Sequence, residues 1–88
     1  MDRLHNILIK AISDPKIIIS IDGVSCTVKR HEGTFIFNHP NCAMIYRLID
    51  FETIEETENG YILFHEDEDM PFELTFSLAL SLNDIENR

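Results

Sequence analysis

Apolar and polar residues alternate without interruption through the last quarter of the chain. From residue 72 to residue 82 every second side chain is large and apolar: Phe72, Leu74, Phe76, Leu78, Leu80 and Leu82. A period of two is typical of a β-strand that buries one face, whereas at helical pitch these side chains would spread around most of the axis. Asp69 and Pro71 would also suit the start of a helix, but the pattern favours a strand over 72–82.

This predicted strand is long for a chain of 88 residues. At about 3.3 Å per residue it would reach roughly 36 Å, which exceeds the width of roughly 30 Å expected for a compact domain of this size. The strand is therefore expected to bend, to end early, or to extend beyond the domain and meet a partner. The polar segment 83–88 is expected to form a frayed tail.

The first segment of the chain has helical spacing instead. Its apolar residues recur three and four positions apart: Leu4, Ile7, Leu8, Ala11 and Ile12. This spacing predicts an amphipathic helix over 2–13, which Asp14-Pro15 would end. A helix with one apolar stripe can cover one face of a sheet.

Two turn signals organise the next third of the chain. Asp22-Gly23 joins the strands expected at 16–22 and 24–29, because this dipeptide accepts the positive φ angles of a tight turn. Glu32-Gly33 then leads into a third strand at 34–38, whose two phenylalanines share its inward face.

The segment 42–54 is ambiguous, because its apolar residues fit either one face of a helix or one face of a strand. We favour a strand, since the hairpin that follows needs a partner leading into it. That hairpin runs from 53–58 through Asn59-Gly60 to 61–65 and carries the clearest turn signal in the chain. The sum is a single α+β domain over 1–88, with one N-terminal amphipathic helix packed on a mostly antiparallel sheet of five or six strands.

Charge is distributed unevenly along the chain, whose formal net charge is −9. Residues 1–49 hold four acidic and six basic residues, whereas residues 50–88 hold twelve acidic residues and one basic residue. The acidic half would repel nucleic acid and anionic lipid and would attract basic partners. The alternative interpretation is that the charge only keeps a small, apolar domain soluble.

Patterns for catalysis or metal binding are sparse. The three glycines stand at turns rather than in a phosphate-binding loop. His39 and Cys42 form one pair of zinc-type ligands, but a structural zinc site takes two such pairs, and the acidic run 66–69 lacks the spacing and the glycine of an EF-hand. We therefore expect no enzymatic activity, no metal and no cofactor, with Cys26 and Cys42 as free thiols.

Two charged surfaces remain as candidate sites. The first is acidic, would bind the basic surface of a protein partner, and consists of Glu52, Glu55, Glu56, Glu58, Glu66, Asp67, Glu68 and Asp69, with Asp50 and Glu73 nearby. Carboxylates in rows can imitate a phosphate backbone and so occupy the basic channel of a nucleic-acid-binding protein. The second is a basic turn that could hold a nucleotide phosphate, formed by Lys29, Arg30, His31 and Arg47.

In size, acidity and lack of catalytic motifs the chain resembles the small inhibitor proteins that bacteriophages direct against host defence systems or host enzymes. The resemblance is general and implies no particular site residue. It implies an acidic, non-enzymatic interaction protein, such as an anti-defence inhibitor that mimics nucleic acid. Two alternatives stay open: a protein that sequesters a nucleotide at the basic turn, and a structural or chaperone-like homodimer.

The sequence also bears on location and assembly. It shows no signal peptide and no apolar run as long as a membrane span, so we expect a cytoplasmic protein, in the host cytoplasm if phage-encoded. Direct binding to membranes or to nucleic acid is not expected. We expect a homodimer or higher homo-oligomer built partly by 72–82, because so small a core is marginal and an unpaired strand edge invites pairing.

Overall fold

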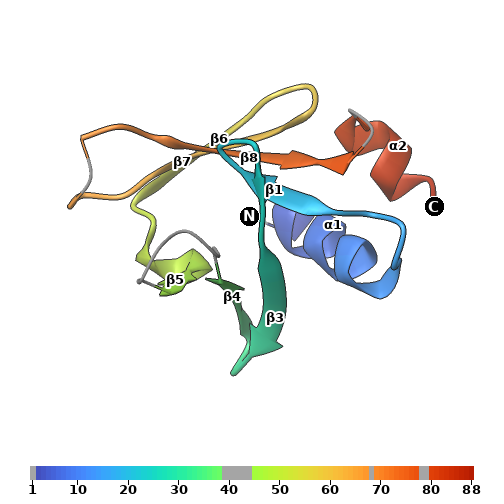
Figure 1. Cartoon of the computed structure of the whole chain (residues 1–88), viewed down its shortest axis with the longest axis horizontal. Coiled ribbons are helices and arrows are strands. Elements are labelled where there is room, and N and C mark those ends of the chain that lie inside the picture. Colours follow the sequence, from blue (N-terminus) through green and yellow to red (C-terminus); the bar gives the residue numbers. More distant parts are fainter. Residues whose placement is uncertain (1, 39–44, 68, 78–79) are drawn as a thin grey trace.

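The structure, a computed structural model, describes residues 2–38, 45–67, 69–77 and 80–88 and has the α+β architecture expected from the sequence (Figure 1). Its elements in chain order are α1 Asp2–Ser13, β1 Ile19–Ile21, β2 Val24–Ser25, β3 Thr27–His31, β4 Thr34–Asn38, β5 Ile45–Arg47, the 3-10 helix η1 Leu48–Asp50, β6 Thr53–Glu56, β7 Gly60–Phe64, β8 Phe72–Phe76 and α2 Leu82–Glu86.

Five strands form one antiparallel sheet in the order β2-β1-β8-β7-β6. β8 lies at its centre, where Leu74 stands opposite Ile21 of β1 and opposite Tyr61 of β7. All three side chains are buried in the common core with the apolar residues of α1. The alternation in the sequence therefore identifies the buried face of the central strand correctly.

The helix predicted over 2–13 is confirmed as α1. Its apolar stripe of Leu4, Ile7, Leu8 and Ala11 is buried almost completely. Its first turns also reach the second sheet, because the rings of His5 and of Phe35 in β4 pack edge to face with centroids 5.0 Å apart. One helix thus joins the core of both sheets.

Strands β3, β4 and β5 form this second, separate antiparallel sheet. The single strand predicted over 24–29 is divided at Cys26, which lies between the end of β2 at Ser25 and the start of β3 at Thr27. The N–H of Cys26 donates to the C=O of Ile19 at 2.9 Å, and the chain then leaves the first sheet. Because Cys26 and Val28 both pack against the core, the hydrophobic alternation continues through the division and does not reveal it.

The strand predicted over 72–82 ends early. β8 stops at Phe76, and the N–H of Ser77 donates to the C=O of Ile18 at 2.8 Å. The chain later enters α2, whose N-cap is Ser81. The Ser81 hydroxyl accepts from the N–H of Asp84 at 3.2 Å, and the Asp84 carboxylate accepts from the N–H of Ser81 at 3.0 Å. These two bonds satisfy helix N–H groups that would otherwise lack partners.

The expected frayed tail at 83–88 is wrong for its first four residues, which belong to α2. Ile85 is fully buried, and Leu82 is buried from a helix rather than from a strand. Because β8 pairs with β1 on one side and β7 on the other, it offers no free edge. The expectation that 72–82 builds an oligomer through an unpaired edge is therefore wrong in its mechanism.

The ambiguous middle segment contains both kinds of structure. β5 is a strand and η1 is a turn of 3-10 helix, so the predicted strand holds for β5 only, and 42–44 lie outside the described residues. The hairpin expected at 53–65 is confirmed by β6 and β7, with Glu56 opposite Tyr61. The sheet expected to have five or six strands is instead two sheets, of five and three strands.

Gly60 allows β7 to pack closely against β8. A Cβ atom placed on this residue would lie 1.9 Å from the carbonyl oxygen of Leu74. The neighbour is main chain in the middle of the sheet and cannot move aside as a flexible side chain would. The turn expected at Asn59-Gly60 therefore lies one residue earlier, at Glu58-Asn59. Gly60 is the first residue of β7, where its lack of a Cβ atom is a packing requirement.

Candidate functional site

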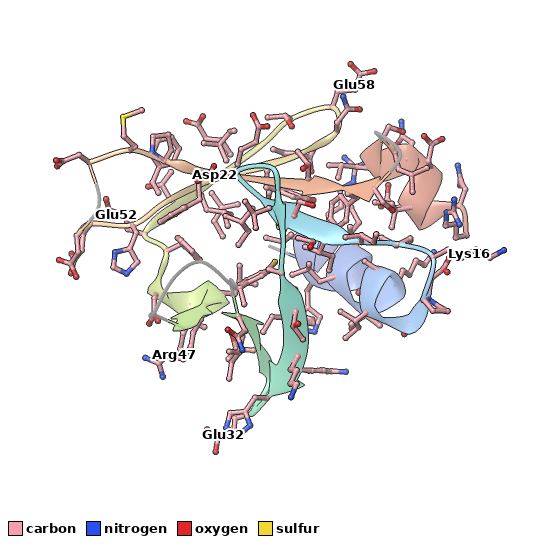
Figure 2. All side chains as sticks on the ribbon, in the orientation of Figure 1. Lys16, Asp22, Glu32, Arg47, Glu52 and Glu58 are labelled. Atoms are coloured by element: carbon pink, nitrogen blue, oxygen red, sulfur yellow. The ribbon has the colours of Figure 1, made fainter. Side chains whose placement is uncertain are left out.

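Acidic side chains line the β6–β7 hairpin and the loop that follows it (Figure 2). The N–H of Glu52 donates to the C=O of Phe64 at 2.9 Å, which brings the start of β6 beside the end of β7 and its acidic loop. We define the acidic surface as the exposed carboxylates of this region that the sequence predicted: Glu52, Glu55, Glu58, Glu66, Asp67 and Asp69. Glu68, also predicted for this site, lies outside the described residues.

The carboxylates of the acidic surface are not neutralised locally. Within the described residues, none of the six forms an ion pair or a side-chain hydrogen bond. Like charges gathered without counter-charges add to a negative potential that extends beyond the surface until salt screens it, over about 8 Å at physiological ionic strength.

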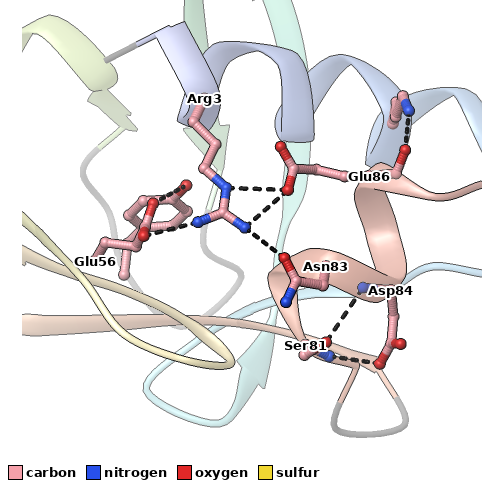
Figure 3. A network of polar contacts seen from close by, with 8 residues as sticks. Arg3, Glu56, Ser81, Asn83, Asp84 and Glu86 are labelled. Carbon is pink, nitrogen blue, oxygen red and sulfur yellow. Dashed lines mark hydrogen bonds and ion pairs between the residues drawn. The ribbon is translucent and has the colours of Figure 1, made fainter.

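Glu56 is the exception among the predicted acidic residues. Its carboxylate accepts a hydrogen bond from Arg3 of α1 at 2.8 Å and from the hydroxyl of Tyr61 at 3.4 Å (Figure 3). Arg3 also binds Glu86 at 2.7 Å and Asn83 at 3.0 Å, both on α2. The hydrogen bond to Glu86 raises the pKa of Arg3, and burial raises the pKa of Tyr61 to about 12. Glu56 therefore joins β6 to both helices and is not part of the acidic surface.

Glu73 extends the negative charge across the outer face of the five-stranded sheet. The register places Glu55, Ile62 and Glu73 opposite one another on β6, β7 and β8, so all three side chains share a face. The carboxylate of Asp22 accepts from the N–H of Glu73 at 2.8 Å and so fixes the main chain there. Only strand pairing reveals this row, since its members are far apart in the sequence.

The basic turn is assembled in part. Lys29, Ile36 and Arg47 stand opposite one another on β3, β4 and β5, and His31 lies on the same face, two residues beyond Lys29. Arg30 lies on the opposite face of β3, across from Phe35. The structure thus brings three of the four predicted residues to one face and separates the fourth.

The guanidinium of Arg47 already binds a carboxylate of its own chain. Its guanidinium donates from Nε and from a terminal nitrogen to the two oxygens of Asp50, at 3.2 and 3.1 Å. The hydrogen bond raises the pKa of Arg47 and lowers that of Asp50. Sequence reasoning did not identify this pair, for which the spacing of three residues was the only signal. It weakens the case for a phosphate at this face, because the strongest phosphate-binding group is neutralised.

A groove of about 620 Å³ separates the end of α1 and the start of β1 from the base of β3. Ile12, Ile18, Cys26 and Val28 contribute to its lining. Burial raises the pKa of the Cys26 thiol to about 11, so the thiolate needed for nucleophilic chemistry is scarce at neutral pH. No set of three or more histidine, cysteine or acidic side chains gathers as a metal site in the described part of the chain. His39 and Cys42 lie outside it.

No protein-family model, curated protein or solved structure matches the chain. None of the described helices is long and apolar enough to cross a membrane.

Proposed function

We propose that this protein binds the basic surface of a protein partner through its acidic surface. One observation carries the proposal: six exposed carboxylates gather on one hairpin and its adjoining loop, and within the described residues none of the six forms an ion pair. Elsewhere in those residues, acidic side chains with basic neighbours are paired, as in Arg3–Glu86 and Arg47–Asp50. A basic partner would supply the missing counter-charge.

The partner class follows from the chemistry of the site. Carboxylates along a strand and its flanking loops present negative charges in a row, as a nucleic-acid backbone does. A groove lined by lysine and arginine that normally binds phosphates would accept such a row, and bound nucleic acid would be displaced. Nucleic acid itself would be repelled by the same charges. The protein would thus inhibit its partner by occupying the partner's nucleic-acid-binding groove, which is the mode of action that the resemblance to phage inhibitors implies. This mode of action requires no chemical reaction.

Capture of an anion at the basic face is the second candidate, because the register gathers Lys29, His31 and Arg47 around Ile36. This second candidate has weaker support, since Asp50 forms an ion pair with Arg47, and the carboxylate of Glu32 lies 3.6 Å from Nε2 of His31. Calorimetry with mono-, di- and cyclic nucleotides tests it, with Lys29→Ala as the variant that should lose any heat. No heat from the wild type would exclude this candidate.

Competition for basic proteins tests the leading proposal. Labelled DNA is bound to a panel of purified nucleic-acid-binding proteins with basic channels, and its release is followed by fluorescence polarisation as this protein is added. We expect release from at least one member, with an affinity that falls steeply with salt. The triple variant Glu52→Gln, Glu55→Gln and Glu58→Gln should release less DNA.

The matched control for this experiment is Glu32→Gln. Glu32 is exposed and carries the same charge as Glu55, but lies at the β3–β4 turn, outside the acidic surface. We expect Glu55→Gln to weaken binding more than Glu32→Gln does, although both remove one negative charge. Equal effects of the two single variants would mean that net charge, not the acidic surface, attracts the partner, and the proposal would fail.

A further inference from the structure

We infer that copies of this chain associate head to tail, with β3 of one copy pairing antiparallel with β6 of the next. Within the described residues both are edge strands: β6 lies at one edge of the five-stranded sheet, and β3 lies at one edge of the three-stranded sheet. An unpaired edge presents main-chain N–H and C=O groups that another strand can complete. The inference shares Glu55 with the proposed function but names a partner for it, a second copy.

The two edges carry opposite charge. β3 ends in Lys29, Arg30 and His31, all exposed, and within the described residues Lys29 and Arg30 have no ion-pair partner. β6 carries Glu55, and its tip leads to Glu58, whereas Glu56 is already bound by Arg3. Opposite charges facing each other across paired strands stabilise the pair, whereas either edge would repel a copy of itself. Charge complementarity therefore favours β3 with β6 over β3 with β3 or β6 with β6.

The two hairpin turns determine which main-chain groups are available. Positive φ angles at Glu32 and Gly33 give the tight two-residue turn that pairs His31 with Thr34, and Thr57 donates its N–H to Gly60 at 2.8 Å in the other hairpin. Hydrogen-bonded and non-hydrogen-bonded pairs alternate from these turns. The groups pointing outward are then those of Val28 and Arg30 on β3 and of Ile54 and Glu56 on β6.

One register satisfies both requirements. When Lys29 stands opposite Glu55, the outward groups of Arg30 meet those of Ile54, and the outward groups of Val28 meet those of Glu56. The Lys29–Glu55 pair is then a non-hydrogen-bonded pair, in which side chains lie closest, and both residues project from the outer faces of their sheets. The pairing of Lys29 with Glu55 thus satisfies three conditions at once: the main-chain hydrogen bonds, the opposite charges and the orientation of both side chains toward the outer faces.

This interface uses different surfaces on its two partners. After two copies pair, one of them still has a free β6 and the other a free β3, so association continues into chains or closes into rings instead of stopping at a symmetric dimer. β8 takes no part, because it is paired on both sides.

Charge reversal tests the inference by sedimentation from about 10 to about 500 micromolar, a range suited to so small an interface. The wild type should form species larger than a dimer as concentration rises, and salt should reverse this. Lys29→Glu and Glu55→Lys should each weaken association by about tenfold, because an attractive cross-strand pair becomes repulsive. Mixing the two variants, or combining both changes in one chain, should restore association.

The controls change the same charges away from the edges. Lys16→Glu matches Lys29→Glu, and Glu66→Lys matches Glu55→Lys, since both control residues are exposed and lie on neither strand. Neither control variant should weaken association as its edge-strand counterpart does. Arg30→Pro gives an independent check, because it removes an outward N–H that the hairpin does not use and should block β3 while leaving β6 able to end a chain.

A wild type that remains a monomer throughout, that stops at a dimer, or that shows no rescue on mixing the reversed variants would overturn the inference. These results are separate from a failure of the proposed function. A monomer that still releases DNA from a basic protein in a salt-dependent way would keep the proposed function and reject self-pairing. Self-pairing without any such release would do the reverse.

Discussion

Arg3 and Glu86 bind each other at 2.7 Å although they are 83 positions apart in the chain. The same guanidinium reaches Glu56 and Asn83, so one side chain of α1 binds the end of β6 and two residues of α2 (Figure 3). A cluster of this kind contributes more than a single exposed ion pair, because one ordered side chain serves several partners. It also directs Glu56 away from the acidic surface.

Replacing Arg3 should therefore loosen α2 before it unfolds the molecule. Arg3→Ala removes the donor that Glu56, Asn83 and Glu86 share, and hydrogen exchange of the amides at 82–86 should become faster while that of β7 and β8 changes little. Arg47→Ala is the control, since it also removes a guanidinium from a carboxylate partner, Asp50, but within the described residues Arg47 makes no hydrogen bond to α2. Equal exchange rates at α2 in the two variants would show that Arg3 does not hold the helix.

The second prediction concerns the close approach at Gly60. Gly60→Ala should lower the free energy of unfolding by about 3 kcal/mol, because the added methyl group would overlap the main chain of β8. Gly23→Ala is the comparison: it has positive φ but open space around it, so it should cost only about 1 to 2 kcal/mol. Urea unfolding measures both. A smaller loss for Gly60→Ala than for Gly23→Ala would contradict the packing explanation.

A third prediction follows from the burial of Ile85, which belongs to a segment expected from sequence to be a frayed tail. Ile85→Ala should cost about 2 to 5 kcal/mol of unfolding free energy, since it opens a cavity in the core. Asn87→Ala, an exposed change two residues later, should cost little. A tail that frays in solution would make both variants as stable as the wild type.

Local patterns predict this fold wherever neighbouring residues determine the structure. The Asp22-Gly23 turn and the helical spacing of Leu4 to Ala11 need no information from elsewhere in the chain. The segment after β8 shows the limit: Leu80 and Leu82 continue the alternation of β8 in the sequence, yet β8 ends at Phe76 and α2 begins at Leu82. Leu82 and Ile85 therefore enter the core from a helix. The capping box of Ser81 and Asp84 was the available signal.

The sequence predicts which residues contribute charge to the candidate site but not how these residues are arranged in space. The clustering of acidic residues after position 50 is visible in the sequence, and the hairpin makes it a surface. By contrast, the row of Glu55 and Glu73 and the facing of Lys29 with Arg47 depend on strand pairing between distant segments. Register cannot be read from charge, because a shift of one residue moves every side chain to the other face.

The fourth prediction concerns acid. The hydrogen bonds at the start of α2 lower the pKa of Asp84 below its ordinary value of 3.8, so the ionised carboxylate favours the folded state. This stabilisation is present above pH 3.8 and is lost as the pH falls through that value toward the lower pKa of the folded state. Asp84→Asn should lower stability at pH 7 and make the remaining stability less sensitive to acid. Thermal unfolding between pH 7 and pH 2 should show the two curves converging at the acid end, and parallel curves would refute the assignment.

The last prediction concerns the groove beside Cys26. Burial raises the pKa of this thiol from 9.0 to about 11, so near neutral pH its thiolate fraction should be about a hundredfold below that of an unhindered cysteine. In a Cys42→Ser background, iodoacetamide should label Cys26 correspondingly slowly in the folded protein. The same chain in urea provides the reference rate, because unfolding returns the thiol to water. The labelling rate of the folded protein should still be rising tenfold per pH unit at pH 9, where an ordinary thiol begins to level off. A folded rate equal to the urea rate, or a plateau near pH 9, would show that the thiol is exposed and that the groove does not shield it.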